Sequence, residues 1–389
     1  MLILSRTLWR LFAYMIVIFL CPLVGVRVSQ KPVGPYLEFP PIPEKIQSLP
    51  FSWGVFCLIA AFAIIALKPF LSRIDVSNIP PSTQKPTKYR FPVWGWLGAV
   101  LMIMAWVVAW NRFSWFQAWQ EFTFTPLWLS YILIINAMTF RRIGRCLLIN
   151  QHCYYGLLFL VSACFWWSFE YLNRFVQNWY YVGITGFGSV RYFIYATLPF
   201  STVLPAVLGT AEWLDTFPRL SAGLERFERF RPFGTKAIAV PCLVAAAAGL
   251  VALGVWPKTL YSLVWLLPIL LVIGLQSFAQ KPNLVLEIEA GDWRRVWILA
   301  LSGLICGFFW EMWNINSLAH WQYSIPYVQR FEIFEMPLLG YLGYLPFGVL
   351  CGLFAEFTLP LSVKSGWTDH RREPKNSHRA CGAVDFSDR

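Results

Sequence analysis

The chain has 389 residues, of which 57% are hydrophobic and only 13% are charged. Soluble globular domains carry about 25% charged residues, so this composition excludes a water-soluble globular enzyme. The net charge of +12 falls in blocks between apolar stretches, a pattern that is typical of membrane topology and argues against a nucleic-acid-binding protein.

Ten apolar stretches are long enough to be transmembrane helices, because a helix needs roughly 20 apolar residues to cross a bilayer. We therefore expect an all-α, polytopic membrane protein. The first stretch follows two arginines, as in a signal peptide, but no small-x-small cleavage motif precedes the Pro-rich segment 32–50, so we expect a retained anchor. In chain order, the predicted spans lie near residues 8–26, 52–70, 92–110, 124–140, 147–169, 192–212, 237–256, 259–277, 296–314 and 336–360.

The positions of Lys and Arg predict the orientation of these spans. With the N-terminus in the cytoplasm, the cytoplasmic segments contain 24 of the 32 basic residues and the outer segments contain 8. Adding or removing one span would move the segments rich in Lys and Arg that follow it to the other side of the membrane. The sequence therefore predicts a multi-pass protein of the cell inner (plasma) membrane, with its N- and C-termini in the cytoplasm.

Three segments are expected to lie outside the membrane. Residues 71–91 are polar and Pro-rich, which is typical of a loop. Residues 215–236 place apolar side chains at helical spacing among arginines, which predicts an amphipathic helix on the anionic inner leaflet or a docking site for a partner. The charged tail 362–389 is predicted to be disordered. The apolar positions of the predicted amphipathic helix are Leu220, Leu224, Phe227 and Phe230.

A weak internal similarity is the most informative feature of the sequence. Residues 164–181 read CFWWSFEYLNRFVQNWYY, and residues 306–323 read CGFFWEMWNINSLAHWQY. Alignment of Glu170 with Glu311 brings further positions together. These are Asn173 with Asn314, Trp179 with Trp321, Tyr181 with Tyr323, Trp128 with Trp265, Pro199 with Pro337, and Ala211-Glu212 with Ala355-Glu356.

The similarity divides the membrane part into two units of four predicted spans. Four is even, so both units cross the membrane in the same direction, which predicts a parallel repeat about an axis along the membrane normal. The predicted divisions are a two-helix N-terminal region with the Pro-rich loop (1–91), the first repeat (92–214), a basic linker (215–236), the second repeat (237–361) and the tail (362–389).

Each copy has a glutamate and an asparagine three residues apart, Glu170 and Asn173 in the first and Glu311 and Asn314 in the second. Positions i and i+3 are neighbours on a helix, so each carboxyl and its amide lie on one helix face. Glu311 follows Arg295 by 16 residues, or roughly 24 Å of helix, which puts it in the outer part of the bilayer. A carboxyl in apolar surroundings can act as an acid, and aromatic faces stabilise cations. We expect Glu311 to be the catalytic acid, with Glu170 or Glu335 as its partner and His320 as a proton relay. The expected substrate-binding residues are Asn173, Asn314, Trp310, Trp313, Trp321, Tyr323 and Trp179.

Structural explanations exist for the same residues. Trp and Tyr form interfacial belts at helix ends, and a Glu or His near the interface is often simply hydrated or paired. The nine Cys and four His show no C-x-x-C, H-x-x-x-H or E-x-x-H spacing, and no phosphate- or dinucleotide-binding motif is present. We therefore expect neither a metal ion nor another cofactor.

The order of an acid, Trp-x-Tyr and a proline at the start of the next span resembles the integral-membrane lycopene cyclases of the heterodimeric or fused type and their carotenoid hydratase relatives. The matching residues are Trp310-Glu311, Trp321-x-Tyr323 and Glu335-Met336-Pro337, with Glu170 and Trp179-Tyr180-Tyr181 in the first half. Leu338 and Leu339 follow the proline where that family carries a paired acid, and the unit has four spans instead of three. The resemblance implies a carotenoid-like substrate.

The leading hypothesis is an enzyme that acts by acid catalysis on an apolar lipid or isoprenoid, in a pocket between the halves. Its expected partners are this substrate and membrane lipids, without nucleic acid; protein partners stay open. A transporter or flippase for a lipid-like solute is the first alternative, because parallel repeats are common in transporters. A non-catalytic membrane assembly subunit is the second.

Overall fold

The computed structural model describes residues 2–41, 49–72, 89–184, 186–229, 235–281 and 283–359. Most of this part of the chain is helical, in agreement with the predicted all-α fold, and two short two-stranded sheets are added. Among the described residues, eight helices are long and apolar enough to cross a membrane, or up to ten if each of two bent helix pairs is one span. Each of the ten predicted stretches coincides with one of these helices or pairs.

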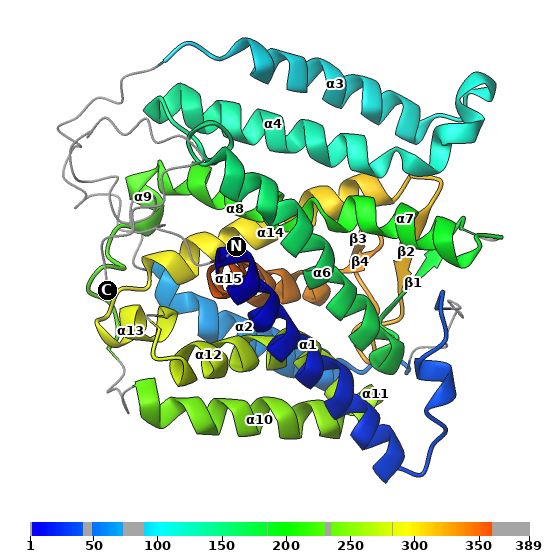
Figure 1. The fold of residues 1–389 in the computed structure, drawn as a ribbon, viewed down its shortest axis with the longest axis vertical. Helices are drawn as coiled ribbons and strands as arrows, with labels where there is room; N and C mark the ends of the chain where they lie inside the picture. The colour runs from blue at the N-terminus through cyan, green and yellow to red at the C-terminus, as the bar shows by residue number, and fades with distance from the viewer. Residues whose placement is uncertain are drawn as a thin grey trace.

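The longer helices are listed here with their bounds (Figure 1). They are α1 (Leu2–Val28), α2 (Trp53–Ser72), α3 (Val93–Trp110), α4 (Phe124–Ile143), α6 (His152–Val176), α7 (Ser189–Phe200), α8 (Val203–Asp215), α10 (Thr235–Val255), α12 (Leu267–Phe278), α14 (Arg294–Asn314) and α15 (Tyr344–Thr358).

The shorter elements connect these helices. The short α-helices are α5 (Leu147–Asn150), α9 (Pro218–Ser221), α11 (Pro257–Leu260) and α13 (Leu284–Glu289). The 3-10 helices are η1 (Gly34–Tyr36), η3 (Ser114–Phe122), η4 (Tyr261–Trp265) and η5 (Leu338–Gly343). The strands are β1 (Trp179–Val182), β2 (His320–Tyr323), β3 (Glu332–Ile333) and β4 (Met336–Pro337).

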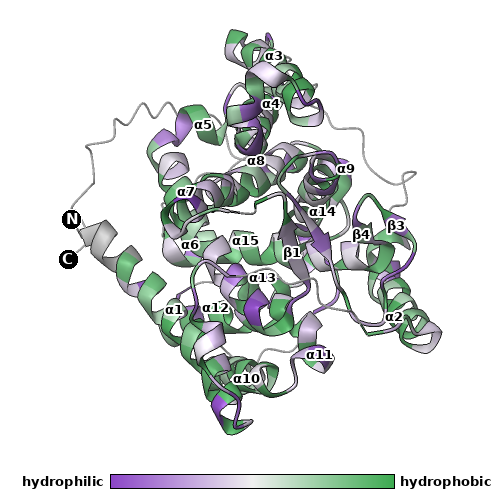
Figure 2. Ribbon diagram, turned by 90° about the vertical axis from the view of Figure 1, so that its right-hand side faces the viewer, coloured by the Kyte–Doolittle hydropathy of each residue, from purple (hydrophilic) through white to green (hydrophobic). Residues whose placement is uncertain are grey.

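The helix pair α3–α4 lies along one edge of the molecule and the pair α10–α12 lies along the opposite edge, with α6, α8, α14 and α15 between them (Figure 1). Figure 2 shows hydrophobic residues over most of the helices and hydrophilic residues on β1 and several connecting segments. The apolar helices therefore run side by side, and the sheet of β1 and β2 lies at one end of the bundle.

One tryptophan from each half of the chain packs on the long central helix of the other half. Trp128 of α4 packs on Trp310 of α14 with ring centroids 4.9 Å apart. Trp265 of η4 packs on Phe169 of α6 at 5.2 Å. The two tryptophans are aligned in the sequence comparison, as are Phe169 and Trp310, so the two contacts are equivalent across the halves.

The two ends of the described chain lie at the same end of the bundle. The Arg10 guanidinium near the start of α1 donates a hydrogen bond to the Phe357 carbonyl at the end of α15 (2.9 Å). The strands β1 and β2 lie at the other end (Figure 1).

The prediction of an amphipathic helix over residues 215–236 is wrong, because between the end of α8 at Asp215 and residue 229 only the four-residue α9 is helical. Leu224, one of its predicted apolar positions, is fully buried in the protein. Long-range backbone pairing replaces local helical bonds here. The two bonds are Trp293 N to Leu224 O (2.8 Å) and Phe227 N to Gly291 O (2.9 Å). Phe230, most of the predicted loop 71–91 and the tail 362–389 lie outside the described residues.

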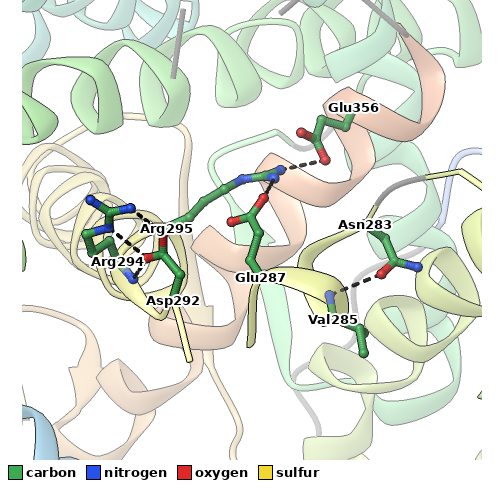
Figure 3. Close-up of polar contacts among 7 residues, drawn as sticks. All are labelled: Asn283, Val285, Glu287, Asp292, Arg294, Arg295 and Glu356. Carbon is green, nitrogen blue, oxygen red and sulfur yellow. Dashed lines mark hydrogen bonds and ion pairs between the residues drawn. The ribbon is translucent and has the colours of Figure 1, made fainter. Parts of the chain in front are cut away.

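A charged cluster joins α13, α14 and α15 (Figure 3). Helix α13 lies at the end of the bundle opposite β1 and β2 (Figure 1). The Arg295 guanidinium lies 2.8 Å from the Glu287 carboxylate and 2.5 Å from the Glu356 carboxylate. The Asn283 side chain caps α13 by accepting a hydrogen bond from Val285 N (3.1 Å). Burial raises the pKa of Glu287, although the Arg295 charge opposes this shift.

We expect Arg295→Gln to destabilise the protein by about 1–3 kcal/mol at neutral pH, because two carboxylates would face each other without their shared cation. The native pKa of Glu287 already lies above its usual value, and loss of the cation raises it further. Protonation of Glu287 as the pH falls through this raised pKa removes the repulsion, so the defect should shrink as the solution is made acidic. Thermal unfolding of the purified protein at neutral and at acidic pH measures it.

The matched control is Arg226→Gln, which removes an exposed arginine that follows α9. It should leave the unfolding temperature unchanged. Equal stability of the two variants at neutral pH would contradict a structural role for the Arg295 cluster.

Candidate functional site

The two Trp-x-Tyr segments pair with each other as the antiparallel strands β1 and β2. Trp179 lies opposite Tyr323, and Tyr181 lies opposite Trp321. The residues that align in the sequence are thereby exchanged across the sheet: the tryptophan of each segment faces the tyrosine of the other. The two copies of the motif meet at one place in the molecule.

The asparagine of each copy ties its strand to the end of its helix. The Asn314 side chain donates to Trp321 O (2.7 Å) and accepts from Trp321 N (2.8 Å). The Asn173 side chain makes the equivalent bonds with Trp179 O (2.7 Å) and Trp179 N (3.3 Å). The two amides therefore position the strands, and they do not lie on the pocket wall described below.

Glu170 is buried beneath three donors from its own half. Its Oε1 accepts hydrogen bonds from Trp166 Nε1 (3.0 Å), Trp179 Nε1 (3.1 Å) and the Tyr181 hydroxyl (2.6 Å). The residue is 4% exposed. This arrangement fixes two indoles and one phenol around a single carboxyl oxygen.

Glu311 is fully buried and has two phenols on one oxygen. Its Oε1 accepts from the hydroxyls of Tyr323 (2.6 Å) and Tyr344 (2.5 Å). Trp321 Nε1 donates to the Tyr323 hydroxyl (2.8 Å). Glu311 Oε2 has no hydrogen-bond partner among the described residues, although it is buried. The two carboxyls are thus equivalent in position but differ in the groups that surround them.

Two sequence differences between the halves explain why different groups surround Glu170 and Glu311. One turn before each glutamate stands Trp166 in the first half and Gly307 in the second. A Cβ at Gly307 would lie 2.3 Å from the Tyr344 ring, so the glycine makes room for this phenol. The spacing of the two Ala-Glu pairs aligns Tyr344 with Phe200, which has no hydroxyl. This alignment replaces the predicted match of Pro199 with Pro337, because Pro199 lies within helix α7 and Pro337 lies in strand β4. The first half therefore caps its glutamate with Trp166, and the second half uses Tyr344.

The aromatic side chains of both copies enclose a pocket with an empty volume of about 1010 Å³, counting the part that opens to the outside. Twelve of its lining residues are aromatic, and both carboxyls lie behind its wall. The lining residues are Phe124, Trp166, Trp179, Tyr181, Ile184, Tyr192, Tyr195, Ala196, Pro199, Phe200, Val203, Trp265, Trp310, Ala319, Trp321, Tyr323, Met336, Gly340, Gly343 and Tyr344.

The phenols of Tyr181 and Tyr323 are hydrogen donors on this wall. Burial is the main cause that raises the pKa of each well above the ordinary phenol value, and the nearby carboxyls, Glu170 and Glu311, raise it further. Both hydroxyls therefore remain protonated at physiological pH and present O–H groups to the carboxyls.

His320 lies on the strand but not at the carboxyl. Side chains alternate along a strand, so His320 and Gln322 face away from the side that carries Trp321 and Tyr323. On that other face the Tyr180 hydroxyl donates to the Gln322 side chain (2.8 Å), and the His320 ring lies 3.3 Å from its own loop's Leu318 carbonyl. The geometry does not bring His320 to Glu311 or Glu335.

Two further expected site residues lie off the pocket wall. Glu335 occupies the turn between β3 and β4, is half-buried, and makes no hydrogen bond or ion pair within the described residues. Trp313 is buried between α14 and α4, where it packs on Trp128 with ring centroids 5.1 Å apart. The expected residues Trp179, Trp310, Trp321 and Tyr323 do line the pocket.

Two pocket residues, Tyr344 and Trp265, were not expected from the sequence as parts of the site. Tyr344 is 33 residues away from Glu311 in the chain, so no local spacing connects the two. The available signal was the alignment of Ala211-Glu212 with Ala355-Glu356, which matches Tyr344 with Phe200, another residue of the pocket wall.

Within the described residues, no group of three or more His, Cys, Asp or Glu side chains could hold a metal ion. Comparison of the chain with protein-family models, with curated proteins and with solved structures found no match. The chemistry of the pocket is therefore the basis for a functional proposal.

Proposed function

We propose that this chain is a membrane-embedded enzyme that protonates an apolar isoprenoid or related lipid in the pocket between its two halves. The set of apolar helices supports insertion as a multi-pass protein, and the excess of Lys and Arg at one side supports cytoplasmic termini in the inner membrane. The pocket then faces the outer leaflet, because it lies at the end of the bundle opposite Arg10 and Phe357.

The observation that carries the proposal is the pairing of pocket phenols with a buried carboxyl. Tyr323 and Tyr344 line the pocket, and both hydroxyls reach Glu311 behind it. No Lys or Arg forms an ion pair with Glu311 among the described residues. A buried carboxyl without a cation is best accommodated as the neutral acid.

The proposed step moves one proton from Glu311 to a substrate double bond. Tyr323 or Tyr344 gives its hydroxyl proton to one alkene carbon and takes the Glu311 proton in return. The alkene π electrons form the new C–H bond, which leaves a carbocation on the substrate and a carboxylate on Glu311. The aromatic wall stabilises this cation through its ring faces.

Glu170 has a different role in this proposal. Its Oε1 receives three hydrogen bonds, and Arg174 follows one turn later on α6. Three donors, against two at Glu311, and the nearby Arg174 charge favour the charged form of Glu170 more than that of Glu311, so in this proposal Glu170 is the anionic partner that stabilises positive charge in the pocket.

The equivalent contacts across the halves support a parallel duplication about an axis through the sheet of β1 and β2. The resemblance of the Glu311, Trp321-x-Tyr323 and Pro337 elements to membrane lycopene cyclases and carotenoid hydratases supports a carotenoid-like substrate. We therefore propose a chemical class of substrate and no particular product.

Mass spectrometry of organic extracts from the purified protein tests the substrate class. The wild-type protein should carry an apolar isoprenoid or related lipid above the level of bulk membrane lipids. Ala196→Trp, which fills the pocket, should lose this molecule. The control Gly156→Trp adds the same side chain at a helix position with no neighbouring atom within 4 Å and should keep it. Equal extracts from all three proteins would contradict the proposal.

Tyr344→Phe is expected to lower substrate conversion about tenfold, because one of the two phenols that connect Glu311 to the pocket is removed while Tyr323 remains. Conversion is measured in a strain whose lipid or pigment profile depends on the gene. Tyr180→Phe is the matched control, since it removes a hydroxyl on the other face of the sheet. Equal conversion by both variants would exclude a role for the Tyr344 hydroxyl.

A further inference from the structure

The 3-10 helix η3, which precedes α4, is an exposed element that lies next to the pocket. It has nine residues, longer than most 3-10 helices, and it is bent by 68° relative to α4. Trp115 and Trp119 are 73% and 64% exposed, as expected for side chains at a lipid interface. Gln120 is its one buried residue, and its amide donates to the Val108 carbonyl of α3 (2.7 Å).

The end of η3 contacts α7 through one ion pair and one ring contact, which together we call the η3–α7 seam. Glu121 pairs with Arg191, and the side chain of Arg191 is 55% exposed. The Phe122 ring packs edge-on against Tyr195 at 5.8 Å. Tyr195 and the next ring along the chain, Phe124, both line the pocket. The seam therefore lies directly outside the pocket wall.

The seam is held by few interactions. The ion pair has one exposed partner, Arg191, and one partner, Glu121, whose side chain is only 12% exposed, so it contributes modestly to stability, and a single aromatic pair adds a similar amount. The helices on either side are held much more firmly, because Phe200 of α7 packs on Trp167 and Phe124 of α4 packs on Trp321. Opening at the seam would leave α4 and α7 in place.

We propose that η3 is a lid over a lateral entrance between α4 and α7, and that the apolar substrate enters the pocket from the outer leaflet through this entrance. The Glu121–Arg191 pair and the Phe122–Tyr195 ring contact together hold the lid closed. Trp115 and Trp119 hold the outer surface of η3 in the lipid interface, so that an opened lid faces lipid and not water. The inference rests on the proposed function for the identity of the substrate, but the lid itself does not depend on the acid chemistry.

A thiol placed in the pocket tests the lid without any catalytic assay. Ala196→Cys, in a background without other cysteines, is reacted in proteoliposomes with N-(1-pyrenyl)maleimide dissolved in the bilayer. Arg191→Glu replaces the attraction to Glu121 with repulsion, and we expect it to accelerate labelling roughly fivefold to tenfold. The exchanged pair Glu121→Arg/Arg191→Glu should return the rate to within about twofold of the parent.

A lipid-facing thiol controls for the reagent and for folding. Ile103→Cys on α3 is 65% exposed, and its labelling rate should be the same in all three backgrounds. An unchanged Ala196→Cys rate in Arg191→Glu, or failure of the exchanged pair to restore it, would overturn the lid. Either result would leave the proposed acid chemistry standing, because that chemistry is tested by variants of Glu311.

Discussion

Glu311→Gln is expected to lower substrate conversion at least about a hundredfold in a strain whose lipid or pigment profile changes when the gene is lost. Glutamine has nearly the same size and its amide oxygen can still accept hydrogen bonds from Tyr323 and Tyr344. It has no acidic proton to give, however, so the proposed transfer to the substrate cannot begin. The protein should reach the membrane at the wild-type level.

The matched control for this variant is Glu332→Gln, the same chemical change at an exposed position of strand β3. It should restore the wild-type profile completely. If Glu311→Gln restores the profile as well as the control at equal membrane level, Glu311 is not the acid.

Gly348→Val is expected to cost roughly 3 kcal/mol or more and to prevent stable folding. At Gly348 helix α15 touches helix α14, and an added Cβ would lie 2.1 Å from the Leu299 carbonyl oxygen. Gly303 makes the reciprocal approach, since its Cβ would lie 2.7 Å from the Gly348 Cα. The neighbours are backbone atoms, so side-chain movement cannot relieve the clash. Small residues at such crossings allow the close packing on which membrane helices depend.

Gly156→Val is the control, because Gly156 also lies within a long helix but has no atom within 4 Å of an added Cβ. Both changes alter the intrinsic helix preference in the same way. Thermal unfolding and size-exclusion profiles in detergent compare them. Equal behaviour of the two variants would contradict the tight contact between α14 and α15.

The long apolar helices were predictable because each depends on a long run of similar residues. A stretch of about 20 apolar residues identifies a span whatever its neighbours are. The correspondence of Glu170 and Glu311 was also predictable from the sequence, because the Glu-x-x-Asn spacing and the downstream Trp-x-Tyr occur twice. These features indicated a single site between the halves before any contact was known.

The contacts within the site depend on tertiary structure and were less predictable. The Trp-x-Tyr segments also fit an interfacial belt, and only their mutual pairing makes them strands of one sheet. The contact of Tyr344 with Glu311 could not be predicted from local spacing, because the two residues are 33 positions apart in the chain. The contact also requires that residue 307 be a glycine, since a side chain there would occupy the place of the Tyr344 ring. The predicted amphipathic helix failed for the same kind of reason, since Leu224 pairs with a distant backbone segment.

The proton on Glu311 is the central element of the proposed chemistry, and infrared spectroscopy measures it directly. In wild-type protein reconstituted in lipid at neutral pH, we predict a C=O stretching band of a protonated carboxylic acid that disappears in Glu311→Gln and persists in Glu170→Gln. Absence of that band from the wild type, or its persistence in a correctly folded Glu311→Gln protein, would contradict the account.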